Sequence, residues 1–492
     1  MNFKLFGILI VTCFTIFFTS CDEECTFECK NGSVCIDGDC DCTAGWTGID
    51  CSTPITEDCD NDCLNDGVCN NGTCNCADGW TGVDCNTPTA AIIETISGDA
   101  LRITDEITLT ADKIYNVVGR LTVENGGVLT IEPGAILKFA EGQEASASAL
   151  LVARGGKINA VGTAEKPIIL TSVLDAINLG EINGSLGKTD VQKWGGLIIL
   201  GNAKISAQDG DTEANIEGLP VGVDSVYGGD DDSDNSGVIQ YLSVRHGGIN
   251  IGEGNELNGI TLGGVGNGTT IDHIEVVANL DDGIELFGGT VNVNHAIIAY
   301  QGDDAIDIDQ NYAGTINNFV VKHGNSNTDE ALEIDGPENS TYTDGLFTLM
   351  NGTVINDGTE GSAGDLRSLA QGTITNVSFE GYSNGPGKFL KLRASYDPAN
   401  ECAEKTDAYS NFLDGKLNIE SCGFAGLTSL TNAVTAYKDD DDAPCHTDNT
   451  VLPNEAGVDE KTKNSNNKTE AVSGADLSEF AGWSWSAING EI

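Results

Sequence analysis

The stretch QGDDAIDIDQN, residues 301–311, decides the fold because close copies of it lie on both sides. A near copy, NLDDGIELFGG, starts 22 residues earlier, and a looser copy, NTDEALEIDGP, follows it. Apolar and acidic residues alternate in each copy, as in a strand with one buried face. Ile306 and Ile308 should therefore point inward and Asp307 outward. The same alternation places Ile284, Leu286, Leu332 and Ile334 inside and Glu285 and Glu333 outside.

Short strands recur along the rest of the chain from residue 89 onward. GTTIDHIEVV, GTVNVNHAIIA, GTINNFVVKHG and GTITNVSFEG start at Gly268, Gly289, Gly314 and Gly372, with no helical periodicity between them. Strands that return about every twenty residues are typical of a solenoid. An antiparallel sandwich also has short strands, but it predicts no constant repeat length. We therefore predict an all-β fold, a right-handed parallel β-helix, over residues 89–492.

Both ends of a solenoid need capping. We expect residues 92–110 to cap the first coil and the segment with Trp483 and Trp485 to close the last one. Between the coils and that segment, residues 438–468 are polar and acidic. They are predicted to form a mobile loop or tail.

Stacked coils would align the acidic residues of the three copies in rows, about 4.8 Å apart. So many neighbouring carboxylates raise one another's pKa or recruit a cation, and oxygen ligands suit calcium. Solvated acidic turns without metal are the alternative. The three rows are Asp281, Asp303 and Asp329; Asp282, Asp304 and Glu330; and Glu285, Asp307 and Glu333. A second calcium candidate is DDDSDNSG, with Asp230, Asp232 and Asp234.

The N-terminus, residues 1–20, has the pattern of an export signal, with Lys4 before an apolar run. The run ends in FFTSC, which resembles a bacterial lipoprotein signal and implies a lipid on Cys21. The CDEE that follows resembles the surface-export signal of Bacteroidota lipoproteins. This resemblance implies a lipid-anchored protein on the outer face of the outer membrane. An ordinary secretory signal, with Cys21 in a disulfide, is the alternative.

Twelve cysteines form two sets of six, and adding 34 to each position of the first set gives the second. This tandem repeat defines two small modules, residues 21–52 and 53–88. Modules of this size need disulfides to fold. Spacing alone leaves the pairing open. Three more cysteines, Cys402, Cys422 and Cys445, leave one thiol unpaired, and the sequence does not say which.

The cysteine spacing, with Gly45-Trp46 and Gly79-Trp80 before the last cysteine, resembles the EGF-like module of tenascins and teneurins. We expect the pair to act as a spacer, with partner binding as the alternative. The resemblance implies the bridges Cys25–Cys35, Cys29–Cys40, Cys42–Cys51, Cys59–Cys69, Cys63–Cys74 and Cys76–Cys85.

The formal net charge of −52 argues against nucleic acid and anionic lipid as partners, since both would be repelled. It favours cations, basic partners or neutral glycans. LTIEPG, KWGGLIILGNA, DDGIELFGG and GDDAIDID resemble motifs of largely uncharacterised bacterial surface β-helix proteins. That resemblance covers most of residues 107–336.

A second resemblance is to polygalacturonase-type glycoside hydrolases, β-helices with aspartates on neighbouring coils. NLD, GDD and KHG carry Asp281, Asp303, Asp304 and His323 in the family's order. The resemblance implies Asp304 as general acid and Asp281 and Asp303 as the groups that activate water. The family's Arg-x-Lys motif has no match here, since KLR at residues 391–393 is reversed. We therefore expect a calcium-stabilised binding or adhesion protein for glycans or cell-surface partners, with polysaccharide hydrolysis as the alternative.

Overall fold

The structure is a computed structural model that divides into two compact units, residues 1–90 and 91–492. No helix among the residues that it describes is long and apolar enough to cross a membrane. The predicted export signal, Cys21, Cys25, Cys59 and most of the acidic loop lie outside the described residues. The described residues are 26–54, 63–70, 72–77, 80–88, 91–142, 147–217, 219–252, 255–324, 328–338, 340–358, 361–438, 445 and 456–492.

The first unit consists of two similar disulfide-rich modules. Each module contains two short antiparallel ladders. Few of the described side chains are buried, so disulfides supply most of the cross-linking. The strands are β1 (Val34–Ile36), β2 (Asp39–Asp41), β3 (Trp46–Thr47), β4 (Thr53–Pro54), β5 (Val68–Asn70), β6 (Thr73–Asn75), β7 (Trp80–Thr81) and β8 (Thr87–Pro88).

Four disulfides of this unit lie within the described residues, and they join the pairs that the EGF-like resemblance implies. They are Cys29–Cys40, Cys42–Cys51, Cys63–Cys74 and Cys76–Cys85. Cys35 and Cys69 are also disulfide-bonded. Their expected partners, Cys25 and Cys59, lie outside the described residues.

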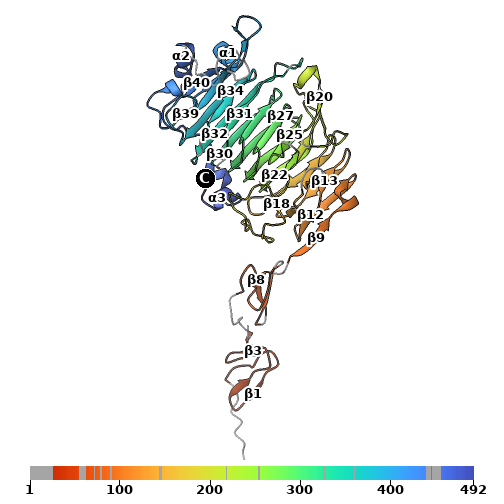
Figure 1. The fold of residues 1–492 in the computed structure, drawn as a ribbon. Coiled ribbons are helices and arrows are strands. Elements are labelled where there is room, and N and C mark those ends of the chain that lie inside the picture. The colour runs from red at the N-terminus through yellow and green to blue at the C-terminus, as the bar shows by residue number, and fades with distance from the viewer. Residues whose placement is uncertain are drawn as a thin grey trace, which may run out of the picture. The chain divides into compact units, whose positions relative to one another are not determined.

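The second unit is a right-handed parallel β-helix, as predicted. Its described residues form two large parallel sheets of 11 and 15 strands, stacked coil upon coil (Figure 1). The shorter sheet contains β10 (Arg102–Ile103), β13 (Arg120–Val123), β16 (Ala149–Val152), β19 (Leu197–Leu200), β25 (Ile260–Gly263), β27 (Ile284–Phe287), β29 (Ile306–Asp309), β31 (Leu332–Ile334), β33 (Gly364–Leu366), β35 (Leu390–Ala394) and β40 (Val434–Lys438).

The longer sheet covers the other two sides of each coil. Its strands are β9 (Ile92–Ile96), β11 (Glu106–Leu109), β12 (Lys113–Val117), β14 (Val128–Ile131), β15 (Ile136–Phe139), β17 (Lys157–Val161), β18 (Ile168–Ser172), β22 (Gly237–Arg245), β26 (Thr270–Val277), β28 (Asn292–Ala299), β30 (Thr315–His323), β32 (Phe347–Asn356), β34 (Gly372–Glu380), β38 (Leu417–Glu420) and β39 (Gly423–Phe424).

A bend divides each long strand of this sheet into two sides of the coil. The first half of β22 pairs with β17 and the second half pairs with β18, and Tyr241 lies between them with φ +49°. Left-handed residues stand at the same bend in the following coils, which explains why a single strand can turn the corner without a loop. They are His273, His295, Asn318, Asn351 and Asn376.

The apolar residues of the repeated acidic phrases lie in the core, as predicted. Ile284, Leu286, Ile306, Ile308, Leu332 and Ile334 are all fully buried. Their strands pair in parallel, and Ile306 lies between Ile284 and Leu332. Trp194 also belongs to this core, where it stacks on Phe139. The core is therefore a set of aliphatic stacks that runs the length of the solenoid.

Helices α1 (Ala408–Asp414) and α2 (Ala456–Asn464) close the C-terminal end of the solenoid. Helix α1 packs against β35 and β38, while α2 packs against β40, the last strand of the shorter sheet. The end of the predicted mobile loop is thus helical. Cys402 pairs with Cys445, and Cys422 is a buried free thiol.

The segment that contains Trp483 and Trp485 does not close the last coil, contrary to expectation. Trp483 packs edge-on against Tyr241 and His273, on strands β22 and β26. The segment includes η6 (Leu477–Phe480) and α3 (Trp485–Ile488), and Figure 1 shows α3 beside the middle coils. Its aromatic side chains pack in a buried cluster along the flank of the longer sheet.

The remaining short elements lie in connections. They are η1 (Gly98–Leu101), η3 (Gln208–Gly210), η4 (Leu430–Asn432), β20 (Glu213–Asn215), β21 (Val226–Gly228), β23 (Asn250–Gly252), β24 (Asn255–Glu256), β36 (Tyr396–Asp397) and β37 (Ala403–Glu404). The hairpin β20–β21 belongs to a long insertion after β19, which covers part of the outer face of the shorter sheet.

Candidate functional site

An acidic cavity of about 400 Å³ opens on the outer face of the shorter sheet. Strands β27, β29 and β31 supply its floor, and the turns before them supply its rim. It brings together eight of the nine carboxylates in the predicted rows. Its lining residues are Glu217, Asn258, Asp281, Asp282, Glu285, Asp303, Asp304, Asp307, Asp329, Glu333 and Arg367.

The row on the strands is set by the register of the parallel sheet. Glu285 pairs with Asp307, which in turn pairs with Glu333. Thr261 precedes this row and Asp365 follows it at the same position. The predicted alignment of the three acidic residues is therefore confirmed, and the acidic row starts after Thr261 and continues for one further coil at Asp365.

The inner row of the turns is held by the backbone of the next coil. Asp282 accepts a hydrogen bond from the Asp304 N–H at 2.9 Å, and Asp304 accepts one from the Glu330 N–H at 2.6 Å. Asp282 and Asp304 are 7% and 6% exposed. These contacts fix the positions of the two carboxylates, and both residues line the cavity.

The outer row of the turns lies at the mouth of the cavity. Asp303 and Asp329 are exposed, and Asp281 is half-buried. The Asp329 N–H donates to the Asp303 carbonyl at 3.3 Å, and this hydrogen bond holds the two turns in register. The mouth is therefore the part of the acidic site that a large ligand can reach.

Burial and mutual repulsion disfavour the charged form of the carboxylates on the floor. Burial first, and repulsion by neighbouring carboxylates second, raise the pKa of four of them well above the usual range. They are Asp282, Glu285, Asp304 and Asp307. Without a bound cation, the protonated, neutral forms of these four carboxyl groups are therefore favoured over the charged forms.

Among the described residues, the basic side chains that neutralise the acidic rows lie at one end of those rows. Arg367 pairs with Glu333, and Lys391 lies 2.5 Å from Glu330. The next coil repeats the pattern, with Arg393 at 2.5 Å from Asp365. Among the residues that line the cavity, Arg367 supplies the positive charge. The other end, around Asp282 and Glu285, is therefore the more negative.

Two buried oxygens of the cavity have no hydrogen-bond partner among the described residues. They are Asn258 Oδ1 and Asp307 Oδ1. Asn258 is only 4% exposed, and its amide nitrogen donates to Glu285 and to Thr261. The amide is thus fixed with its oxygen unsatisfied, which is a costly arrangement unless a ligand is present.

The carboxylates of the cavity converge in groups that suit a metal ion. Ligand oxygens lie within 4.8 Å of one another in three groups: Asp281, Asp282 and Asp303; Asp282, Glu285 and Asp307; and Asp304, Glu330 and Glu333. The first two groups share Asp282. Oxygen ligands at this density, with a neutral amide oxygen close by, match the preferences of Ca²⁺.

Sequence reasoning missed Asn258, Glu217 and Arg367. Asn258 lies one coil before Asp282, and its phrase NGITLGG repeats the pattern of DGIELFGG with neutral residues. A search for the repeat rather than for acidic residues would have found it. Glu217 follows β20 in the insertion, so no repeat predicts it.

The second predicted calcium loop does not form a site of three converging carboxylates. Asp232 pairs with Lys204 at 2.7 Å, and Asp234 accepts a hydrogen bond from Asn202 at 3.0 Å. Neither they nor Asp230 line the acidic cavity. Asp232 and Asp234 instead tie this loop to the turn after β19.

The proposed hydrolase residues are only partly brought together. Asp281, Asp303 and Asp304 line the cavity, but His323 does not. His323 is fully buried, its Nδ1 lies 2.8 Å from the Tyr382 hydroxyl, and burial lowers its pKa to about 4. A neutral, buried imidazole cannot contact a polysaccharide at the mouth.

Comparison with known proteins gives one family match. A family model described as a pectate-lyase like beta helix domain matches residues 101–485. Neither the curated proteins nor the solved structures with which the chain was compared gave a match. The match agrees with the parallel coils, and it includes all the residues of the acidic cavity.

Proposed function

The chain belongs to the pectate-lyase-like β-helix family, and from this premise we propose that it is a surface binding protein whose acidic cavity holds Ca²⁺. The cation stabilises the solenoid and presents free coordination positions to a glycan or another cell-surface partner. The family's fold is compatible with binding and with action on polysaccharides, so the argument depends on the site itself.

The observation that carries the proposal is the pair of unpartnered buried oxygens, Asn258 Oδ1 and Asp307 Oδ1. Leaving one buried polar group unsatisfied costs about 1–3 kcal/mol. Ca²⁺ takes six to eight oxygen ligands at about 2.3–2.6 Å. A single ion can therefore satisfy these oxygens and neutralise Asp282 and Glu285. A water molecule could satisfy the oxygens but would leave the repulsion unchanged.

The mouth of the cavity favours a hydroxyl-rich ligand. Asp281, Asp282 and Asp303 bring ligand oxygens within 4.8 Å of one another, and Asp303 is exposed. An ion held here keeps coordination positions on the solvent side. Sugar hydroxyls or uronate carboxylates can fill them, whereas an anionic partner without a bridging cation would be repelled by the net charge of −52.

The location that we propose is the outer face of the outer membrane. It is supported by the export pattern of residues 1–20, by the lipoprotein-like cysteine Cys21 and by the disulfides of the first unit. The modules 21–52 and 53–88 would be EGF-like spacers between the lipid anchor and the solenoid. Nucleic acid is not among the proposed partners.

Polysaccharide hydrolysis is the second candidate, favoured by the grouping of Asp281, Asp303 and Asp304 in one cavity. The raised pKa of Asp304 suits a general acid. However, its carboxylate already accepts the Glu330 N–H at the bottom of the turn, and His323 is buried elsewhere. A binding function therefore explains more features of the cavity than a catalytic function does.

The test is calorimetric titration of the full-length protein with Ca²⁺, followed by binding to panels of neutral and uronic acid glycans with and without EDTA. We expect Glu285→Gln to lose the ion, whereas Asp309→Asn, on the neighbouring strand and outside the cavity lining, should retain it. Absence of Ca²⁺ binding contradicts the proposal. Release of new reducing ends from a glycan would instead support the hydrolase.

A further inference from the structure

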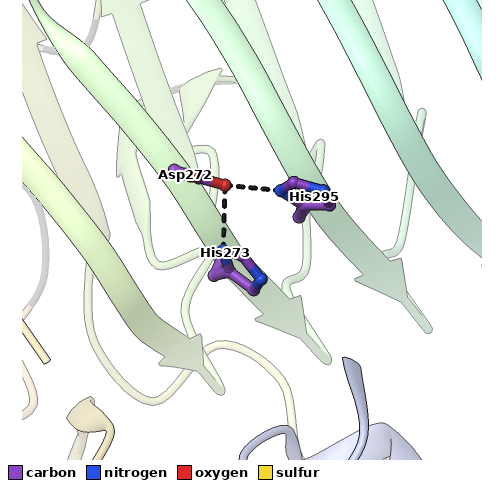
Figure 2. A group of neighbouring side chains, drawn as sticks. All are labelled: Asp272, His273 and His295. Atoms are coloured by element: carbon purple, nitrogen blue, oxygen red, sulfur yellow. Dashed lines mark hydrogen bonds and ion pairs between the residues drawn. The ribbon is translucent and has the colours of Figure 1, made fainter. Parts of the chain in front are cut away.

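A second cluster of possible metal ligands lies on the longer sheet, away from the acidic cavity. Asp272 and His273 are neighbours on β26, and His295 is on β28, one coil further along (Figure 2). The Asp272 Oδ1 atom lies 2.9 Å from His273 Nδ1 and 2.6 Å from His295 Nδ1. Two of the five histidines in the chain thus point the same ring nitrogen at one carboxylate.

The backbone explains why these two rings meet, but it does not require histidine. His273 and His295 both occupy the left-handed bend of the coil, with φ +53° and +52°, and their rings stack 4.3 Å apart. The next three coils place asparagine at this bend, at Asn318, Asn351 and Asn376. Because asparagine tolerates left-handed geometry well, it could serve at the two histidine positions too.

The distances fit a tetrahedral ion after small adjustments. Zn²⁺ binds histidine nitrogen and carboxylate oxygen at about 2.0–2.2 Å, so ligand atoms of a tetrahedral site lie about 3.3 Å apart. The ligand atoms of Asp272, His273 and His295 lie within 4.8 Å of one another. Side-chain exposures of 28% for Asp272 and 24% for His295 leave room for a water molecule as the fourth ligand.

The surroundings of His273 supply an independent indication of a metal ligand. Its other ring nitrogen, Nε2, lies 3.4 Å from Glu479 Oε2. A carboxylate on the far nitrogen fixes the orientation of metal-binding histidines and makes them more basic. Glu479 belongs to η6, and Trp483 packs edge-on against the same ring. His273 is therefore held with Nδ1 directed at Asp272 and His295.

We propose that Asp272, His273 and His295, on adjacent coils β26 and β28, form a binding site for a divalent transition metal, with zinc as the best match. Two imidazoles and one carboxylate suit zinc better than calcium, which prefers oxygen ligands. The site is distinct from the acidic cavity and does not depend on the proposed function.

Metal binding at this site strengthens the attachment of the C-terminal segment. That segment contacts the sheet along several coils. Ser473 donates to Asn376, the Asp476 N–H donates to Asn318, and the Trp485 N–H donates to Glu275. A zinc-bound His273 is fixed in position and strengthens its link to Glu479 through a more polarised ring N–H.

The test is titration of the full-length, untagged protein with Zn²⁺ in excess Ca²⁺, which occupies the oxygen sites. Binding of one zinc ion is expected, with four-coordinate absorption when Co²⁺ replaces it. The double variant His273→Asn/His295→Asn should lose this ion and keep the fold, because asparagine occupies the same bend in later coils. Asp303→Asn/Asp304→Asn, in the acidic cavity, is the matched control and should bind normally.

A second variant separates metal binding from a structural role. Glu479→Gln leaves all three ligands in place and should weaken zinc by about 10- to 100-fold. Zinc should also slow proteolysis within residues 473–492 in the wild type and not in the double variant. Equal zinc affinity in the wild type and the double variant would overturn the proposal, as would octahedral Co²⁺ spectra that both proteins share.

Discussion

The buried carboxylate of Glu275, in the middle of β26, accepts a hydrogen bond from the backbone N–H of Trp485 at 3.0 Å, across 210 positions of sequence. Its second oxygen accepts the Ser486 N–H at 2.8 Å. Ser243 also donates to Glu275, and Arg245 lies 3.8 Å away, with both members of this ion pair fully buried. One side chain therefore joins two strands of the sheet to the start of α3.

Replacing Glu275 with alanine should destabilise the protein by about 3–5 kcal/mol, because it leaves Arg245 as a buried charge and frees two backbone donors. Urea unfolding measures the loss, and limited proteolysis should show early cleavage near residue 485. Glu470→Ala, which removes an exposed carboxylate, is the comparison and should change little. Similar stabilities for the two variants would contradict this role of Glu275.

In the acidic cavity, Asp307→Asn should have opposite effects with and without calcium. In EDTA the variant should be at least as stable as the wild type, because a neutral amide relieves repulsion from Asp304. At a calcium concentration of 100 times Kd the wild type should gain about 2.7 kcal/mol and the variant much less. Thermal melts in both buffers check this. A calcium gain that survives in Asp307→Asn would place the ion elsewhere.

Acid should destabilise the protein through His246. Burial lowers the pKa of His246 to about 4, whereas an unfolded histidine titrates near 6.5. The unfolded chain thus binds the proton first, so stability is complete above pH 6.5 and falls as the pH drops toward 4. The contribution reaches about 3 kcal/mol.

His246→Asn should flatten this part of the pH profile. The residue has φ +64°, which asparagine tolerates. Urea unfolding between pH 4 and 7 provides the comparison, and parallel profiles for wild type and variant would show that another group titrates.

The thiol of Cys422 should be unreactive in the folded protein. It is fully buried, and burial raises its pKa to about 12, so the reactive thiolate is scarce. Iodoacetamide followed by peptide mapping should find Cys422 alkylated only in denaturant. Cys402 and Cys445 should need reductant as well, since they form a disulfide. Rapid labelling of Cys422 in native buffer would show that this end of the solenoid opens.

Asn351 allows backbone strain and amide bonding to be measured separately. It has φ +55°, its amide nitrogen donates to Asn317 at 2.7 Å, and its oxygen accepts from Asn376 at 2.8 Å. Asn351→Gly should lose the hydrogen bonds, about 1 kcal/mol each, but keep the bend. Asn351→Ala should lose a further 1 kcal/mol or so, because alanine is strained there. Equal stability of the two variants in urea would exclude that strain.

The rows of the acidic site could be predicted because the repeat fixes them. An offset of 22 residues between two similar phrases places Asp307 beside Glu285, whatever the exact shape of the turns. However, the repeated acidic residues do not show which other residues line the site. Asn258 completes the cavity with a neutral amide, and Arg367 closes it from the opposite side with a positive charge.

Contacts between segments far apart in sequence could not be predicted. Glu275 has the pattern of an ordinary outward strand residue, and only the position of α3 shows why it is buried. The same holds for His273 and His295. Their offset of 22 residues is consistent with stacked rings on neighbouring coils, but it does not show that Asp272 and Glu479 surround one of them. Such groups depend on the path of connections that carry no repeat.

The course of residues 473–492 along the flank also has a consequence for how the solenoid unfolds. An array in which each coil touches only its neighbours can fray coil by coil from either end. This segment instead bonds to β34, β32, β30 and β26, so these coils cannot separate until it detaches. Local opening is thereby replaced by a single cooperative transition across the middle of the domain.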